Sequence, residues 1–291
     1  MNSRFIPLAI LYIVATIETQ ADSLCKRPKM ISNISITNSL NELRYISDIA
    51  RNFKSLSGLC VDLLEFQEDR YRWQMLLVTH PKVPKGAFWF LPHDNENSAF
   101  DSAIYATKRY GGGFLAVVAD GKRYFNRQDP NRNFGDTTIV ANHCNKQNSP
   151  APKYSKIVFD IIDSYRKKGM PYLALHNNTD RGGVSILKST NSVHSYPAYK
   201  TIRDGGGLSD EDSLVYIAGS SRYPNQQKLH RLLSKGLNVR YEIVNKNTND
   251  CSMSNYVILN KHTDNYFNIE AQHGDTQTQK KMIDILIKSL R

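Results

Sequence analysis

Two histidines and two glutamates in this sequence have the residue types that a hydrolytic metal site needs. His93 and Glu96 stand three positions apart in segment 92–96, PHDNE, and this spacing lets an imidazole nitrogen and a carboxylate converge on one cation from a tight turn. A third ligand from His176 would leave the fourth position of a tetrahedral zinc ion open for water. Glu270 could then act as the separate base that activates this water. The residues therefore predict zinc-assisted hydrolysis.

Each of these residues also has a simpler interpretation when it is taken alone. His93 fits a surface residue at the end of a strand, and His176, which follows Leu-Ala-Leu, fits a buried core histidine. Glu96 fits a favourable carboxylate in the first turn of the next helix. The hypothesis of a shared site depends on elements that bring these residues together.

Short apolar runs alternate with longer amphipathic stretches along most of the chain, and this order predicts an α/β fold. We expect a central mixed, largely parallel sheet flanked by helices. His93, His176 and Glu270 each follow an expected strand directly, and sites in such folds gather at the carboxyl ends of the strands. The expected strands are 71–79, 87–91, 114–119, 172–175, 214–218, 239–244, 256–259 and 266–269, and the expected helices are 40–53, 97–110, 153–168, 225–233 and 276–290.

A further motif lies between the expected ligands. Segment 129–135 reads DPNRNFG. The order of H-x-x-E, D-x-N-R-N-F, a strand-end histidine and F-x-x-E resembles that of the M14-type zinc carboxypeptidases and of the related succinylglutamate desuccinylase and aspartoacylase group. The ordered motifs cover roughly residues 70–275, and D-x-N-R-N-F is the most specific of them.

The resemblance implies a zinc-carboxypeptidase-like fold that holds one zinc ion. On this basis His93, Glu96 and His176 are the zinc ligands, and Glu270 is the general base. The chemistry agrees, because zinc lowers the pKa of a bound water to roughly 7 and polarises the scissile carbonyl. A glutamate can take the proton of that water and pass it to the leaving nitrogen.

The resemblance also implies that Asn131 and Arg132 bind the terminal carboxylate of the substrate. A guanidinium suits this role because its two-pronged donor matches a carboxylate, although a structural salt bridge is the alternative for Arg132. The tetrahedral intermediate needs a further cationic or hydrogen-bonding partner. Arg127 is the preferred candidate, and Arg123 is the other.

We expect three parts in the chain, which are a signal peptide at 1–21, an N-terminal lead-in at 22–70 and a zinc hydrolase catalytic domain at 71–291. Arg4 supplies the positive charge of a leader, and the apolar run 5–17 is too short to span a bilayer comfortably. Cleavage would leave no stable membrane insertion and a periplasmic or secreted protein.

Composition bears on the compartment and on the partners. The four cysteines suggest two disulfides, with four free thiols as the alternative and at least one bridge favoured. The net charge of +11 favours an anionic cell-wall polymer as a neighbour, or it simply maintains solubility. No basic block alternates with aromatic residues, so nucleic acid is not an expected partner. The cysteines are Cys25, Cys60, Cys144 and Cys251.

The expected function is that of an exported zinc-dependent peptidase or amidase acting on an amide bond near a free carboxylate. A carboxypeptidase that acts on peptides, such as cell-wall stem peptides, fits export and positive charge. The alternatives are an N-acyl amino acid deacylase of the desuccinylase type and a non-catalytic module that binds a peptide or glycan. A metal-dependent nuclease has little support, and serine-based hydrolysis has none because no G-x-S-x-G segment is present.

Overall fold

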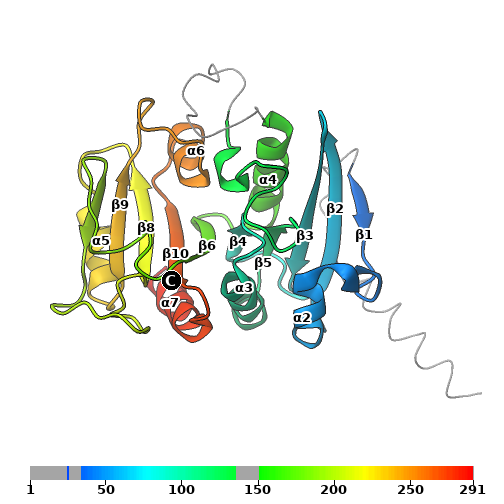
Figure 1. The fold of residues 1–291 in the computed structure, drawn as a ribbon, viewed down its shortest axis with the longest axis horizontal. Coiled ribbons are helices and arrows are strands. Elements are labelled where there is room, and N and C mark those ends of the chain that lie inside the picture. The colour runs from blue at the N-terminus through cyan, green and yellow to red at the C-terminus, as the bar shows by residue number, and fades with distance from the viewer. Residues whose placement is uncertain (1–24, 26–33, 136–150, 291) are drawn as a thin grey trace, which may run out of the picture.

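The computed structural model describes residue 25 and residues 34–135 and 151–290 (Figure 1). The expected signal peptide and Cys144 therefore lie outside the described residues. Strands of the described chain form one sheet. They are β1 (Ser35–Thr37), β2 (Cys60–Glu68), β3 (Tyr71–Thr79), β4 (Phe88–Leu91), β5 (Gly113–Val117), β6 (Tyr172–Asn178), β7 (Val193–Tyr196), β8 (Leu214–Gly219), β9 (Asn238–Ile243) and β10 (Tyr266–Gln272).

The sheet is mixed, and its strands follow the order β1-β2-β3-β5-β4-β6-β10-β8-β9-β7. The central strands β5, β4, β6 and β10 run parallel to their neighbours in that series, and so do β8 and β9. The remaining pairings are antiparallel. The parallel centre has its carboxyl ends at one edge, which is where the expected catalytic residues must meet.

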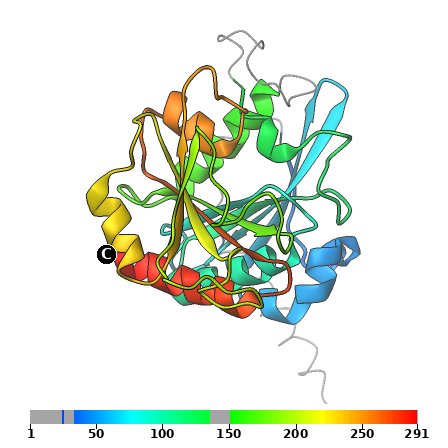
Figure 2. The same ribbon diagram turned by 60° about the vertical axis from the view of Figure 1, so that its left-hand side comes forward.

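Helices cover both faces of this sheet (Figure 2). One face packs against α2, α3, α5 and α7, and the other packs against α4 and α6. The expected α/β class, with a central mixed sheet flanked by helices, is confirmed. The helices are η1 (Glu42–Tyr45), α2 (Ser47–Leu56), α3 (Asn97–Tyr110), η2 (Pro130–Arg132), α4 (Pro152–Tyr165), α5 (Gln226–Leu233), α6 (Met253–Leu259) and α7 (Thr276–Ser289).

Strand β4, which leads to the first candidate ligands, is buried on both faces of the sheet. All four residues of β4, Phe-Trp-Phe-Leu, are buried, as expected for a parallel strand covered by helices on both faces. The helix α3 that follows ends at Tyr110 and is capped by Gly111, and the next residue, Gly112, approaches the segment before β4 closely. A Cβ atom on Gly112 would lie 2.0 Å from the carbonyl oxygen of Ala87, so only glycine fits there.

The strand expected at 256–259 is wrong, because this segment belongs to helix α6. Its residues Tyr-Val-Ile-Leu favour a strand by type, but a short apolar run does not distinguish a strand from a buried helix. The Oγ of Ser252 accepts the backbone N–H of Asn255 at 3.4 Å and caps the helix. The helix expected at 40–53 is divided into η1 and α2, because Ile46 between them has an extended backbone.

The N-terminal part of the described chain adds a hairpin that the hydrophobic pattern did not predict. β2 pairs with β3 from Cys60↔Thr79 to Glu68↔Tyr71, and β1 pairs with β2 at the edge of the sheet. A disulfide joins Cys25 to Cys60, so the expectation of at least one bridge is confirmed. Closing this 35-residue separation contributes about 4 kcal/mol in the chain-entropy model.

Within the residues that the structure describes, no helix combines the length and the apolar character needed to cross a lipid bilayer.

Candidate metal centre and catalytic site

Three adjacent parallel strands bring two of the predicted ligands and the predicted base together. His93 follows β4 by two residues, whereas His176 lies within β6 and Glu270 lies within β10. β6 is hydrogen-bonded to both of the other strands, and Glu270 is paired directly with His176. The sequence pattern ended both strands too early, but it placed these residues correctly at the carboxyl edge of the sheet.

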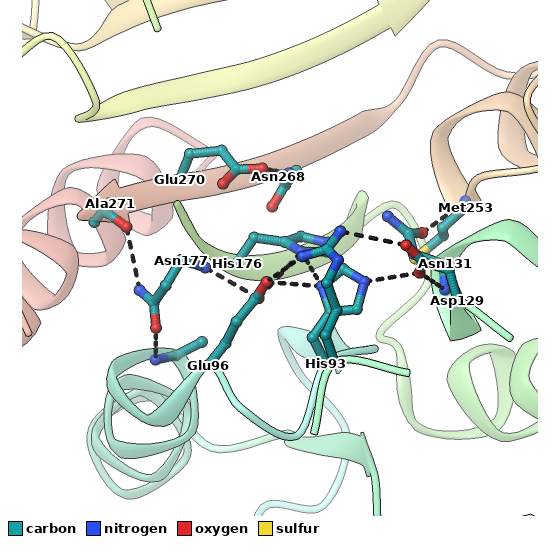
Figure 3. A network of polar contacts seen from close by, with 12 residues as sticks. His93, Glu96, Asp129, Asn131, His176, Asn177, Met253, Asn268, Glu270 and Ala271 are labelled. Carbon is teal, nitrogen blue, oxygen red and sulfur yellow. Dashed lines mark hydrogen bonds and ion pairs between the residues drawn. The ribbon is translucent and has the colours of Figure 1, made fainter. Parts of the chain in front are cut away.

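His93, Glu96 and His176 point toward one another in a buried cluster (Figure 3). The Nδ1 atom of His93 lies 2.7 Å from Oε1 of Glu96 and 3.1 Å from Nδ1 of His176. The Nδ1 atom of His176 lies 3.2 Å from Oε2 of Glu96. Two imidazoles and one carboxylate therefore direct their donor atoms at a common point.

The spacing of these donor atoms fits a tetrahedral zinc ion. Nitrogen and oxygen ligands at about 2.0–2.1 Å from such an ion lie roughly 3.3 Å from one another. The three separations in the cluster, from 2.7 to 3.2 Å, are close to this value. Two histidines and one carboxylate are also a donor set that catalytic zinc uses, with the fourth position left for water.

A second set of groups holds the candidate ligands in place. The Nε2 atom of His93 lies 2.8 Å from Oδ1 of Asp129, an arrangement that leaves Nδ1 to face the other candidate ligands. The guanidinium of Arg123 contacts both Glu96 and Asp129, at 3.2 and 3.3 Å. The backbone N–H of Asn177 donates to Oε2 of Glu96 at 3.0 Å. His93 and Glu96 thus each have a support besides the other candidate ligands.

The charges of the cluster favour positive charge at its centre. Burial opposes ionisation of Glu96, yet the imidazoles of His93 and His176 hold the pKa of this carboxyl well below its usual range. Burial likewise opposes protonation of His93, but the charge of Glu96 and the hydrogen bond that His93 donates to Asp129 raise its pKa above the ordinary value. A divalent cation would supply the positive charge that these two carboxylates favour.

Glu270 differs from Glu96 because it is not a member of the ligand cluster. It is buried, and its Oε1 accepts a hydrogen bond from Nδ2 of Asn268 at 2.8 Å. Burial raises the pKa of the Glu270 carboxyl, although the nearby His176 lowers it in part. A buried carboxylate with a raised pKa beside the ligand cluster is suited to accept a proton.

Asn131, Arg132 and Glu270 line one cavity of about 120 Å³. Asn131 and Arg132 come from η2, and Glu270 and Tyr266 come from β10. The Nε atom of Arg132 lies 3.1 Å from Oδ2 of Asp250, and its Nη1 donates to the carbonyl of Asn131 at 2.8 Å. Arg132 therefore forms a structural salt bridge, which was the alternative to a substrate-binding role. It also lines the cavity that contains the candidate base, Glu270.

The structure places the two candidate arginines differently. Arg123 is half-buried and contacts the ligand cluster, as described above. Arg127 is exposed and lines a different cavity of about 530 Å³ together with Phe125 and Ala119. Arg127 lies in a tight turn, in which the backbone N–H of Phe125 and that of Gln128 each donate to the carbonyl of the other residue. Asn126 and Arg127 have positive φ angles in this turn. Arg123 is therefore the arginine that this geometry brings to the candidate ligand cluster.

Sequence reasoning assigned no role to two aspartates that support the site. Asp129 opens the motif quoted above, and it both orients His93 and accepts the N–H of Asn131 at 2.9 Å. Asp94 lies between the first two ligands, where its Oδ2 accepts the N–H groups of Ala119 and Gly121 at 2.6 and 2.8 Å. The available signal for Asp129 was its place as the first residue of the D-x-N-R-N-F motif.

Comparisons with known proteins give matches in structure but not in sequence. No protein-family model matches the chain, and no curated protein sequence matches it. A Shewanella amazonensis protein known as a "putative metallopeptidase" is 12% identical, with a TM-score of 0.45 over 88% of this chain and 97% of that one.

Two further solved structures are similar at the same level. One is an aspartoacylase family protein from Mesorhizobium loti, 10% identical, with a TM-score of 0.43 over 89% of this chain and 71% of that one. The other is bovine thrombin-activatable fibrinolysis inhibitor, 11% identical, with a TM-score of 0.43 over 87% of this chain and 95% of that one. The assignment of the site rests on the contacts within this chain.

Proposed function

We propose that this chain is an exported zinc-dependent hydrolase that cleaves an amide bond next to a free carboxylate, acting as a carboxypeptidase on peptides. One observation carries the proposal. The donor atoms of His93, Glu96 and His176 lie within 4.8 Å of one another, and an uncoordinated carboxylate, Glu270, is paired beside His176 on the next strand. A metal-ligand set and a separate base are the two parts that hydrolysis by activated water needs.

His93, Glu96 and His176 would hold the zinc ion. When bound, zinc supplies the Lewis acidity that makes water nucleophilic and polarises a carbonyl. Glu270 accepts a proton from water at its carboxylate and delivers it to the leaving nitrogen, and burial, which raises its pKa above the ordinary value, favours acceptance of that proton. Arg123, which contacts Glu96 and Asp129, is the cation placed to stabilise negative charge that develops nearby.

Arg132 provides the group that selects a substrate with a free carboxylate. Its guanidinium has five N–H donors, and the contacts to Asp250 and Asn131 engage only part of them. The remaining donors can bind a carboxylate in the cavity that Glu270 also lines. This arrangement would hold the terminal carboxylate at a fixed distance from the base, so that the bond beside it is cleaved.

Export is part of the proposal and rests on two features. The disulfide between Cys25 and Cys60 is of a kind that persists in oxidising compartments. The net charge of +11 suits an anionic cell wall, which would also be the source of stem peptides. Asn177 begins an Asn-Asn-Thr sequence, which is the pattern of an N-glycosylation acceptor. Its side chain is buried and accepts a hydrogen bond from the N–H of Ala99, so a glycan does not fit there. A periplasmic or secreted protein is the expected form.

Activity of the zinc-loaded protein on peptides with varied carboxyl-terminal residues tests the function. We expect Glu270→Gln to lower kcat by about 10³-fold while zinc content is unchanged, because only the base is lost. Glu65→Gln is the matched control, since Glu65 lies on β2 and contacts Arg72 and Gln74. Full turnover by Glu270→Gln would remove Glu270 from the mechanism.

Product masses distinguish the remaining alternatives. Release of a single carboxyl-terminal residue supports a carboxypeptidase. Release of a small acid from an N-acyl amino acid supports the deacylase, which the cavity of about 120 Å³ also suits. Substrate binding that persists after zinc removal, with no product at any zinc concentration, would instead identify a non-catalytic binding module.

A further inference from the structure

A second group of acidic residues lies outside the imidazole-containing cluster. Asp180 follows β6, and Glu211 and Asp212 precede β8. Carboxylate oxygens of these three residues lie within 4.8 Å of one another. Asp180 is exposed, whereas Glu211 and Asp212 are buried. Three carboxylates this close repel one another strongly unless a cation lies between them.

Asp212 has little compensation for its burial. Its exposed fraction is 0%. Within the part of the chain that the structure describes, neither of its carboxylate oxygens has a partner in hydrogen-bonding geometry. The neighbouring Asp210 shows the contrast, because it accepts N–H groups from Gly205, Gly206 and Asp212. A buried carboxylate without partners is costly, and such a group is often one that binds a ligand.

The cations near this group are engaged elsewhere. Among the described residues, no lysine or arginine forms an ion pair with Glu211 or Asp212, and Arg181 pairs with Asp204. The hydroxyl of Ser185 donates to Glu211. Burial and the charge of Glu211 raise the pKa of Asp212 to about 7, although the backbone of Arg181 opposes the shift. The group therefore lacks positive charge.

The donor atoms and their spacing indicate which cation would fit. The three acidic groups offer only oxygen, which hard cations such as calcium prefer. Two oxygens that each lie about 2.4 Å from a calcium ion are at most about 4.8 Å apart. The side chain of Asn178 lies against the same loop, where its Nδ2 donates to the carbonyl of Asp212 at 3.0 Å and its buried Oδ1 has no partner among the described residues.

Solvent reaches the edge of this group. A cavity of about 260 Å³ is lined by Glu211 and Ser185, together with Arg181 and Asp204. An ion can therefore approach Glu211 from solvent without unfolding of β6 or β8. The buried Asp212 then lies on the inner side of the group, and the exposed Asp180 lies on the outer side.

We propose that Asp180, Glu211 and Asp212 form a calcium site that joins the end of β6 to the start of β8. β6 carries His176, so the ion would stabilise the strand that supports the catalytic cluster, without taking part in the reaction. The site is independent of the proposed hydrolysis, since none of its three residues belongs to the zinc cluster or lines the cavity with Glu270.

Calcium chloride titration of the full mature protein, followed by calorimetry and by thermal unfolding, tests the site. We expect one calcium ion to bind and to raise Tm by about 3 °C at a tenfold excess over Kd, with a smaller rise from magnesium. Asp212→Asn should abolish both signals. Asp180→Asn, an exposed change that leaves the core intact, should weaken calcium binding about 10-fold or more.

Two controls make the outcome specific. Asp160→Asn alters an exposed ion pair on α4 and should respond to calcium like the unmodified protein. His176→Ala should also keep the calcium response, so that failure of the zinc assignment and failure of this proposal are distinguishable. The proposal is overturned if the unmodified protein binds no calcium, if Asp212→Asn retains the response, or if magnesium is equally effective.

Discussion

The two candidate metal sites of this protein, His93–Glu96–His176 and Asp180–Glu211–Asp212, differ in how the charge of their carboxylates is balanced. In the first, Glu96 lies between two imidazoles and an arginine, and its pKa is held low. In the second, Asp212 is equally buried but has only carboxylates as its close charged neighbours, and its pKa is raised. Mixed nitrogen and oxygen donors suit zinc, whereas oxygen donors alone suit calcium. Burial alone therefore does not identify a metal site, and the neighbours decide its chemistry.

Loss of an imidazole should have the largest effect. His176→Ala removes one zinc ligand, so we expect loss of bound zinc and a decrease in kcat/KM of roughly 10³-fold or more. Metal analysis and peptide hydrolysis measure the two effects. His194→Ala is the control, because this histidine lies on β7 and not in the cluster. Unchanged zinc content in His176→Ala would contradict the ligand assignment.

Glu242 shows how a half-buried acid behaves when it has hydrogen-bond donors. It accepts from Nδ2 of Asn255 at 2.9 Å and from Oγ of Ser254 at 3.0 Å, yet burial and the charge of Asp250 raise its pKa from 4.5 to about 7. The folded protein then binds more protons than the unfolded chain between these values. We expect stability to fall by up to about 3 kcal/mol as pH rises from 4.5 to 7, and to change little from this group above that.

Urea unfolding at pH 5 and pH 8 measures this dependence, and Glu242→Gln should flatten it. Calcium should leave the contribution of Glu242 unchanged, since Glu242 is not a member of the second cluster. An equal pH dependence in the unmodified protein and in Glu242→Gln would show that other groups cause it.

Removal of the unpaired charge should stabilise the calcium-free protein. We expect Asp212→Asn to raise the free energy of unfolding by about 2 kcal/mol at pH 8, less than its pKa shift alone suggests, because solvent screens part of the repulsion. Urea unfolding without added calcium measures the change. Asp210→Asn is the opposite test, since Asp210 accepts three backbone N–H groups and its loss should destabilise. A destabilised Asp212→Asn would mean that the carboxylate is not repelled by its neighbours.

The smallest effect is expected from the residue that orients His93. Asp129→Asn should weaken zinc binding by about 10-fold, because the amide supports the imidazole less strongly than the carboxylate does. Competition with a coloured zinc chelator measures the affinity. Asp160→Asn should have no effect on it, and an unchanged affinity in Asp129→Asn would restrict Asp129 to its contacts within η2.

Much of the site was predictable because its residues end apolar runs. His93, His176 and Glu270 each stand at or near the end of a buried strand, and the parallel centre of the sheet then brings them together. The contact of Asp129 with His93 was not predictable, because it joins residues 36 positions apart through a loop without periodicity. The choice between Arg123 and Arg127 depended on two positive φ angles, which sequence does not reveal for an Asn-Arg pair.

The fold was predictable to a similar degree and for similar reasons. Helix α3 has the bounds expected from its periodicity and its glycine stop. Helix α6 was predicted as a strand, because propensity in a run of four residues is weaker than the Ser252 cap and the packing of Tyr256 on Phe159. Strand β2 was missed because Asp62, Glu65 and Glu68 interrupt its apolar pattern.

The direct pairing of Glu270 with His176 makes the candidate active site vulnerable to small changes in chain length. A single residue inserted within β10 before position 270 would turn the glutamate to the opposite face of the sheet, because side chains alternate along a strand. Every metal ligand would remain in place, and the protein would lose only its base. Insertions should therefore be tolerated in the loop that precedes Tyr266, while one extra residue between Tyr266 and Glu270 should yield a folded, zinc-loaded and inactive protein.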